Sequence, residues 1–239
     1  TELIDLGLVP GRLHAAGILP EEATRLFGQL AGGAFPFLNI PTIFTGALQV
    51  ALVPSISGAA VLRDRESIRR RINKALTITL ALALPAAMGL YVLSEQIPAL
   101  LLKDTGIGRI LRPLTPAVLF LALQQVSSGI LHGLGRLRAP LINLSWAALV
   151  KAVLTYVLVG PGLGIVGASI ATTFHFGVAA VLNLWVIQKE LGSPVDAMSV
   201  LKISLASSIM AVAVSLSYTK VTSLTSWKAG TLASIALGI

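Results

Sequence analysis

Residues 63–94 read RDRESIRRRINKALTITLALALPAAMGLYVLS and divide into two segments of opposite character. The first twelve residues carry six basic and two acidic side chains, whereas the next twenty carry no charge. A hydrocarbon core of roughly 30 Å needs about 20 helical residues at 1.5 Å each. The uncharged segment therefore has the length of one membrane crossing, and an arginine-rich loop is predicted before it.

Five further stretches of similar length and composition occur along the chain. The six predicted spans are 34–60, 75–94, 113–134, 141–159, 165–187 and 200–218. The apolar runs 1–9 and 229–239 are typical of the end of one span and the start of another, so we expect about seven crossings and a fragment of a longer protein. The runs do not alternate every second residue, as strands of a membrane barrel would. The sequence predicts an all-α, polytopic transmembrane helix bundle.

The composition indicates a lipid environment and excludes several classes of function. Of 239 residues, 55% are hydrophobic and 12% are charged, whereas soluble domains carry about 25% charged residues. The net charge of +8 lies in short runs between apolar stretches, which argues against a nucleic-acid partner. With no cysteine and three unclustered histidines, no metal or other cofactor is predicted. The sequence shows no Ser-His-Asp set and no paired carboxylates that would indicate an enzyme.

The basic residues predict an orientation. Nine of them, six in residues 63–74, fall on one side of the predicted spans, and seven fall on the other. The positive-inside rule places the arginine-rich side in the cytoplasm. Residues 11–30 would then lie outside, with a short interfacial helix beginning at Pro20.

Lys151 is the most informative single residue, because it lies near the middle of the predicted span 141–159. A charged side chain at that depth costs about 2.5–3.5 kcal/mol. No aspartate or glutamate lies within any of the six spans. Three interpretations remain open: a cavity that receives an anionic ligand such as a phosphate, a carboxylate partner in a missing part of the protein, or a structural role against backbone carbonyls.

Other polar side chains lie within the spans and favour a shared polar interior. Thr172, His175 and Asn183 fall on one stripe of a helix at 100° per residue. The alternative for each is an ordinary hydrogen bond between helices, worth about 0.6 kcal/mol on average. The candidate cavity residues are Arg12, Asn39, Gln49, Gln125, Lys151 and His175.

Two glycine patterns are interpreted as packing motifs. Residues 162–167 match the G-x-G-x-x-G string of dinucleotide-binding folds, but that motif requires a preceding strand and an α/β unit. A long apolar run precedes it here, so a tight turn followed by close helix packing is predicted. Gly129 and Gly133 have the spacing that lets two helices approach closely.

The order of several short segments resembles a known family. These are RLHAAG at 12–17, ATRLFG at 23–28, NIP at 39–41, ALVPSIS at 51–57, QVSSGILHGLG at 125–135, PLIN at 140–143, Lys151 and LGIVGA at 163–168. Together they resemble the stage V sporulation protein B and polysaccharide-biosynthesis branch of the MOP (MATE-like) flippase superfamily.

The resemblance implies a fourteen-helix fold with two six-helix lobes around a cavity that opens alternately to each side. This chain would be the second lobe in residues 1–187, followed by helix 13 and the start of helix 14 in 188–239. Its partner would be a missing N-terminal lobe. The implied function is a flippase of the bacterial plasma membrane, which moves a lipid-linked oligosaccharide or polyprenyl diphosphate for cell-wall, spore-cortex or polysaccharide assembly. Arg12 and Lys151 would be the cations nearest to the diphosphate.

Three other functions remain open. A Na⁺- or H⁺-coupled multidrug exporter of the MATE type is expected to use carboxylates within its spans, which the six predicted spans lack. A non-transporting membrane scaffold of envelope synthesis would need neither Arg12 nor Lys151. A membrane-embedded enzyme would need a constellation of catalytic side chains, and the sequence contains none that we recognise.

Overall fold

Each of the six predicted spans overlaps an α-helix in the computed structural model. The structure describes residues 2–160, 162–192 and 197–224. These helices are α3 (Phe35–Val61), α4 (Arg65–Val92), α7 (Pro116–Gly133), α8 (Arg138–Leu158), α9 (Ile165–Leu191) and α10 (Ala197–Leu224). The described residues contain no strand. Five helical segments are long and apolar enough to cross a membrane, or six if the bent segment that contains α7 is one span. The prediction of an all-α transmembrane bundle is confirmed.

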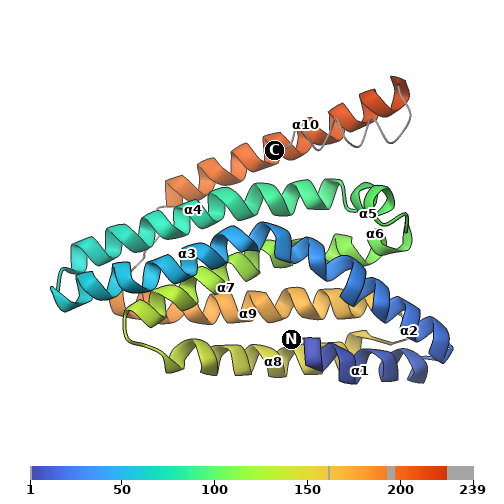
Figure 1. The fold of residues 1–239 in the computed structure, drawn as a ribbon, viewed down its shortest axis with the longest axis horizontal. Coiled ribbons are helices and arrows are strands. Elements are labelled where there is room, and N and C mark those ends of the chain that lie inside the picture. The colour runs from blue at the N-terminus through green and yellow to red at the C-terminus, as the bar shows by residue number, and fades with distance from the viewer. Residues whose placement is uncertain (1, 161, 193–196, 225–239) are drawn as a thin grey trace.

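Helix α1 (Glu2–Ala15) lies at the N-terminal end of the described residues. It has 14 residues, and the N-terminus lies about half-way along the bundle (Figure 1). The predicted start of another span at 229–239 lies outside the described residues.

The helix predicted to begin at Pro20 is present, but it is not a separate element. Helix α2 (Pro20–Gly28) continues through a π-helical turn (Gln29–Ala34) into α3, which gives one continuous helical segment of 42 residues, Pro20–Val61. Gly33 in the π turn allows a close approach, because a β-carbon there would lie 2.7 Å from Ile107 Cδ1. A π turn inserts an extra residue into a helix without ending it. The boundary predicted at residue 30 is therefore wrong.

Two short helices lie at the end of the bundle that carries the π turn. They precede the bend that leads into α7. They are α5 (Gln96–Leu101) and α6 (Gly106–Leu111), followed by a 3₁₀ turn (Arg112–Leu114). The axis bends by 45° between Gly106–Leu114 and Pro116–Gly133. Pro113 and Pro116 lie at this bend, and a proline removes a backbone donor and fixes its own φ.

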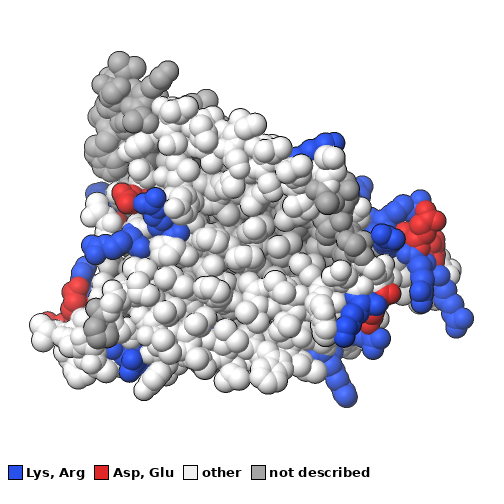
Figure 2. All heavy atoms as spheres, turned by 180° about the vertical axis from the view of Figure 1, so that it is seen from behind, with Lys and Arg blue, Asp and Glu red and all other residues white. Residues whose placement is uncertain are grey.

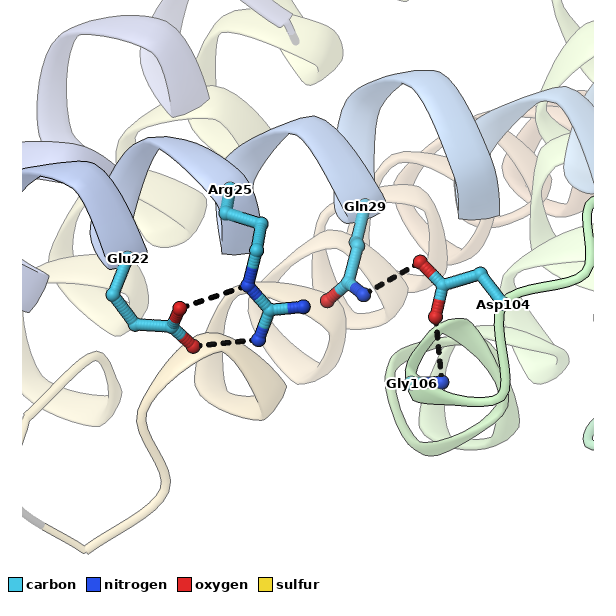
Figure 3. A network of polar contacts seen from close by, with 5 residues as sticks. All are labelled: Glu22, Arg25, Gln29, Asp104 and Gly106. Carbon is cyan, nitrogen blue, oxygen red and sulfur yellow. Dashed lines mark hydrogen bonds and ion pairs between the residues drawn. The ribbon is translucent and has the colours of Figure 1, made fainter.

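A polar network joins the π turn to the loop before α6 (Figure 3). Gln29 Nε2 donates to Asp104 Oδ2 at 2.7 Å, and the Gly106 N–H donates to Asp104 Oδ1 at 2.8 Å. Arg25 forms a two-pronged ion pair with Glu22 on the neighbouring turn, at 2.6 and 2.8 Å. The network holds α6 against the π turn at this end of the bundle.

These contacts predict a pH dependence of stability at Asp104. The hydrogen bond from Gln29, and then that from Gly106, lower the pKa of the Asp104 carboxyl below its ordinary value of 3.8. The stabilisation is present above pH 3.8 and is lost as the pH falls through the lower pKa of the folded state. We expect Asp104→Asn to reduce the loss of thermal stability below pH 3.8, measured by melting in detergent. An unchanged acid limb would contradict this contribution.

Helix α7 lies at the centre and contacts α3, α4 and α9. Its small residues permit this packing: a β-carbon on Gly129 would lie 2.6 Å from the Gln49 carbonyl oxygen, and one on Gly133 would lie 2.8 Å from Ile56 Cβ. The packing role predicted for both glycines is confirmed.

The second glycine pattern forms a turn between α8 and α9. Gly164 has φ of 52°, in the left-handed region that favours glycine. On Gly167, one turn later, a β-carbon would collide with the Leu158 carbonyl. The predicted turn with close helix packing is confirmed.

On the face shown in Figure 2, charged side chains gather at the two ends of the bundle, with a wide uncharged belt between them. The segment predicted as an arginine-rich loop is mostly helical, since α4 begins at Arg65 after Asp64, which accepts a hydrogen bond from the Ser67 N–H at 2.9 Å. Arg71 Nη1 donates to Ser55 Oγ at 2.7 Å and ties α4 to α3. The positive-inside rule assigns the end of the bundle that carries this basic turn to the cytoplasm.

Candidate functional site

An ion pair lies inside the helical bundle, between α1 and α8. The Lys151 ammonium is 2.5 Å from Asp5 Oδ2, and both side chains are 0% exposed. The partner carboxylate comes from this chain and not from a missing part of the protein. Asp5 lies in the segment interpreted as the end of a span, 146 positions before Lys151. The interpretation of Lys151 as an unpaired cation is therefore wrong.

Polar and aromatic groups from α3, α8 and α9 surround the pair. The Phe35 ring centroid is 6.0 Å from Lys151 Nζ. His175 of α9 is buried and lies against the backbone of Ala147, one turn before Lys151 on α8. Thr155, one turn after Lys151, is fully buried, and its hydroxyl has no hydrogen-bond partner among the described residues. Lys151 and His175, both predicted from the sequence, are thus close to one another.

The burial of the pair determines its energetic role. Two charges removed from water are tolerated when they are matched, whereas removing one partner typically costs about 3–5 kcal/mol. Helix α1 contacts both α8 and α9, so the pair also fixes α1 to the bundle. The arrangement can hold helices together, and it can release a cation toward an anion if α1 moves away.

Arg12 provides a second cation at the same interface. Its guanidinium carbon lies 4.1 Å from the centroid of the Tyr156 ring on α8, and the side chain is half-buried. None of the ion pairs formed among residues 2–160, 162–192 and 197–224 involves Arg12. Its Nε is buried without a hydrogen-bond partner among those residues. Arg12 therefore retains donors that can meet an anion.

A separate hydrogen-bond network joins α7, α8 and α9. Asn183 Nδ2 donates to Ser127 Oγ at 3.2 Å and to Ser128 Oγ at 3.0 Å. Asn183 Oδ1 accepts from Asn143 Nδ2 at 2.9 Å. Asn183 is 1% exposed, so this end of the polar stripe formed by Thr172, His175 and Asn183 contributes to packing between helices.

We expect Asn183→Leu to lower the free energy of unfolding by about 1–3 kcal/mol, because buried partners lose their hydrogen bonds. Unfolding in a titration of mixed detergent with SDS measures the change. Asn39→Leu is the control, since Asn39 is exposed on α3 and surface changes usually stay within about 0.5 kcal/mol. Equal effects of the two substitutions would contradict the packing role.

The remaining predicted residues lie elsewhere. Gln125 Oε1 accepts a hydrogen bond from Thr45 Oγ1 at 2.7 Å, which joins α7 to α3. Gln49 is half-buried against Gly129, and Asn39 is exposed. The structure brings together Arg12, Lys151 and His175 at the contacts of α1 with α8 and α9. It places Asn39, Gln49 and Gln125 on α3 and α7.

The fold is similar to that of two solved membrane transporters. A lipid II flippase MurJ in an inward closed conformation matches with a TM-score of 0.65 and 20% identity, over 92% of this chain and 50% of that chain. An inward-facing multidrug resistance MATE family transporter of the MOP superfamily matches with a TM-score of 0.63 and 18% identity, over 98% of this chain and 56% of that one.

Curated relatives come from Bacillus subtilis (strain 168). Stage V sporulation protein B is 27% identical over 185 residues, which are 77% of this chain and 36% of that protein. The uncharacterized membrane protein YabM is 30% identical over 178 residues, which are 74% of this chain and 33% of that protein. The chain therefore spans about a third of the length of these relatives.

The family assignment comes from a sequence comparison that covers most of the chain. The family described as "Lipid II flippase MurJ" matches residues 38–238, from α3 onward. The long apolar helices and the charged ends agree with a multi-pass protein of the bacterial plasma membrane. The chain belongs to the family described as "Lipid II flippase MurJ".

Proposed function

We propose that the protein to which this chain belongs moves a lipid-linked saccharide precursor across the plasma membrane by alternating access. The observation that carries the proposal is the family match over residues 38–238. The likeness to stage V sporulation protein B adds support for a precursor used in spore-cortex, wall or polysaccharide assembly. The lipid tail would stay in the bilayer while the polar head crosses between helices.

This chain would supply the second of two lobes. It covers about half of each similar transporter structure. In this proposal residues 1–187 complete the lobe, and 188–239 belong to two trailing helices. The cavity would form against an N-terminal lobe.

Within the site, Arg12 and Lys151 would have different roles. Arg12 keeps donors available for a diphosphate, and guanidinium groups bind phosphate oxygens in pairs. Lys151 is matched by Asp5 in the closed packing of α1 against α8. It would reach an anion only after the two helices separate. We therefore assign substrate contact to Arg12, and the coupling of α1 to the bundle to the Lys151–Asp5 pair.

The test is leaflet exchange by the full-length protein in vesicles, with a fluorescent polyprenyl-diphosphate sugar and a membrane-impermeant quencher. We expect exchange at least about tenfold faster than in protein-free vesicles. Arg12→Gln should slow it by about tenfold or more, the cost of one charge-assisted contact of about 1.5–3 kcal/mol. Arg25→Gln is the control, since Arg25 is exposed and paired with Glu22. Equal exchange with and without protein would refute the proposal.

A cation-coupled exporter is the second candidate, favoured by the MATE-type structural neighbour and by the carboxylate of Asp5 inside the bundle. It predicts dye efflux that depends on a Na⁺ or H⁺ gradient, with no exchange of the lipid-linked sugar. A non-transporting scaffold predicts neither activity, together with full complementation by the Arg12→Ala, Lys151→Ala double variant.

A further inference from the structure

A long groove runs along the outside of the bundle, between α4, α7 and α10. Its volume is about 530 Å³, which lies within the range of about 300–1,000 Å³ typical of small-molecule sites. Leu84, Met88 and Leu119 line it, with Ala211 and Val212 on the opposite wall. Helix α10 forms that wall and lies alongside α4 at the edge of the bundle (Figure 1). The groove is separate from the Lys151 site, which lies between α1, α8 and α9.

Two of the hydroxyl groups that line this groove donate to backbone carbonyls three or four residues earlier in the chain. The Ser208 hydroxyl donates to the Ser204 carbonyl at 2.8 Å, and the Thr115 hydroxyl donates to the Arg112 carbonyl at 2.9 Å. Both residues line the groove, yet these donors are used within the backbone. The groove therefore offers an apolar surface to its occupant, suited to a hydrocarbon chain.

One end of the groove carries an arginine. Tyr91 lines the groove in the last turn of α4, and the Arg112 guanidinium carbon lies 5.0 Å from the centroid of its ring. Arg112 is exposed, and none of the ion pairs among the described residues includes it. Tyrosine and arginine are the side chains that anchor helices at the membrane–water boundary. A stacked guanidinium keeps its outer N–H groups free to bind phosphate oxygens.

We propose that this groove is a binding site for an anionic membrane phospholipid, with an acyl chain between α4, α7 and α10 and the phosphate at Arg112. A water-filled groove would need polar groups on its walls, and the hydroxyls described above donate to backbone carbonyls. A protein helix would not require a lone arginine at one end. The charge of Arg112 and the apolar walls together fit a lipid whose head and tail differ in polarity.

The occupant is distinct from the lipid that the protein is proposed to move. The groove lies between α4, α7 and α10, and neither Arg12 nor Lys151 is among the residues that line it. The lipid-site inference can therefore be tested separately from the proposed function.

Brominated phospholipids, which quench tryptophan fluorescence on contact, test the site in vesicles. Every tryptophan of the full-length protein, including Trp146, Trp185 and Trp227, is replaced by phenylalanine, and Val212→Trp places a reporter at the edge of the groove. Val212 is 59% exposed, so the larger ring does not have to fill the groove. A second protein that keeps only Trp146, which is exposed on α8, reports ordinary lipid contact.

We expect the reporter at position 212 to favour brominated phosphatidylglycerol over brominated phosphatidylcholine by about fivefold, as one arginine at an anionic surface predicts. Trp146 should show no preference. Arg112→Gln should abolish the preference at position 212, Arg112→Lys should keep most of it, and Arg109→Gln should leave it unchanged. Arg109 is exposed at the same end, but the arginine that stacks on the lining residue Tyr91 is Arg112.

Equal quenching by the two lipids at position 212 would overturn the inference, as would a preference that survives Arg112→Gln. Displacement of phosphatidylglycerol by a smaller amount of polyprenyl phosphate would overturn it as well, because the groove would then prefer an isoprenoid chain. Each of these results is independent of leaflet exchange by the protein.

Discussion

Replacing Lys151 by methionine is expected to lower the free energy of unfolding by about 3–5 kcal/mol, because it leaves the buried Asp5 carboxylate without its cation. Asp5→Leu should cost a similar amount for the converse reason. The double variant Lys151→Met, Asp5→Leu should recover most of the loss, since an apolar pair of similar volume is often neutral in a buried position. Unfolding in a titration with SDS measures all three.

Lys189→Met is the control for the loss of a lysine. Lys189 lies in the last turn of α9, stacked on the Trp185 ring with 3.7 Å between Nζ and the ring centroid. An exposed contact of this kind is worth about 0.5–1 kcal/mol. A Lys151→Met effect no larger than that of Lys189→Met would show that the pair is not buried. Additive losses in the double variant would show that the two side chains do not interact.

Gly167→Ala should lower the free energy of unfolding by about 1–3 kcal/mol, because its β-carbon would collide with the Leu158 carbonyl and force α8 and α9 apart. The sign is informative, since alanine favours a helix over glycine by about 1 kcal/mol. Unfolding measured as for Lys151 determines the sign.

Gly177→Ala, on the same helix, is the comparison that isolates this contact. A β-carbon on Gly177 would lie 3.6 Å from Phe120 Cδ2, an ordinary van der Waals contact. We expect a gain of about 0.5–1 kcal/mol there. Stabilisation by both substitutions would contradict the close approach of α8 and α9 at Gly167.

The spans could be predicted from the sequence because their length and lack of charge are set by the thickness of the bilayer. The predicted span 75–94 falls almost wholly within α4, and 165–187 begins where α9 begins. Hydropathy did not predict that α4 begins at Arg65, because the first turns of this helix lie outside the membrane and are rich in charge. The aspartate cap at position 64 was the available signal.

The partner of Lys151 was not predicted, although one clue was present. Asp5 is an acidic residue within the apolar run 1–9, and an ionisable group in such a run normally faces the protein interior. The pairing itself depends on the docking of α1 against α8, which brings together residues far apart in the chain. No local pattern encodes that contact.

Neither the groove nor the continuation of α2 into α3 could be predicted from the sequence. The groove exists because α10 packs against α4 beside α7, and Arg112 reaches it through the bend before α7. The π turn at 29–34 continues the helix through Gly32 and Gly33. Tertiary contacts with α6 decide the conformation there.

Single cysteines test most directly whether these helices cross a membrane around a sealed polar interior, since the chain contains no cysteine of its own. Arg70→Cys lies at the basic end of α4, Lys103→Cys lies beyond its other end, and Thr155→Cys lies next to the buried pair. A membrane-impermeant maleimide added outside intact cells should label position 103, leave position 70 unlabelled until the cells are opened, and reach position 155 only after denaturation. Labelling of positions 70 and 103 from the same side, or of position 155 in the native protein, would contradict this arrangement.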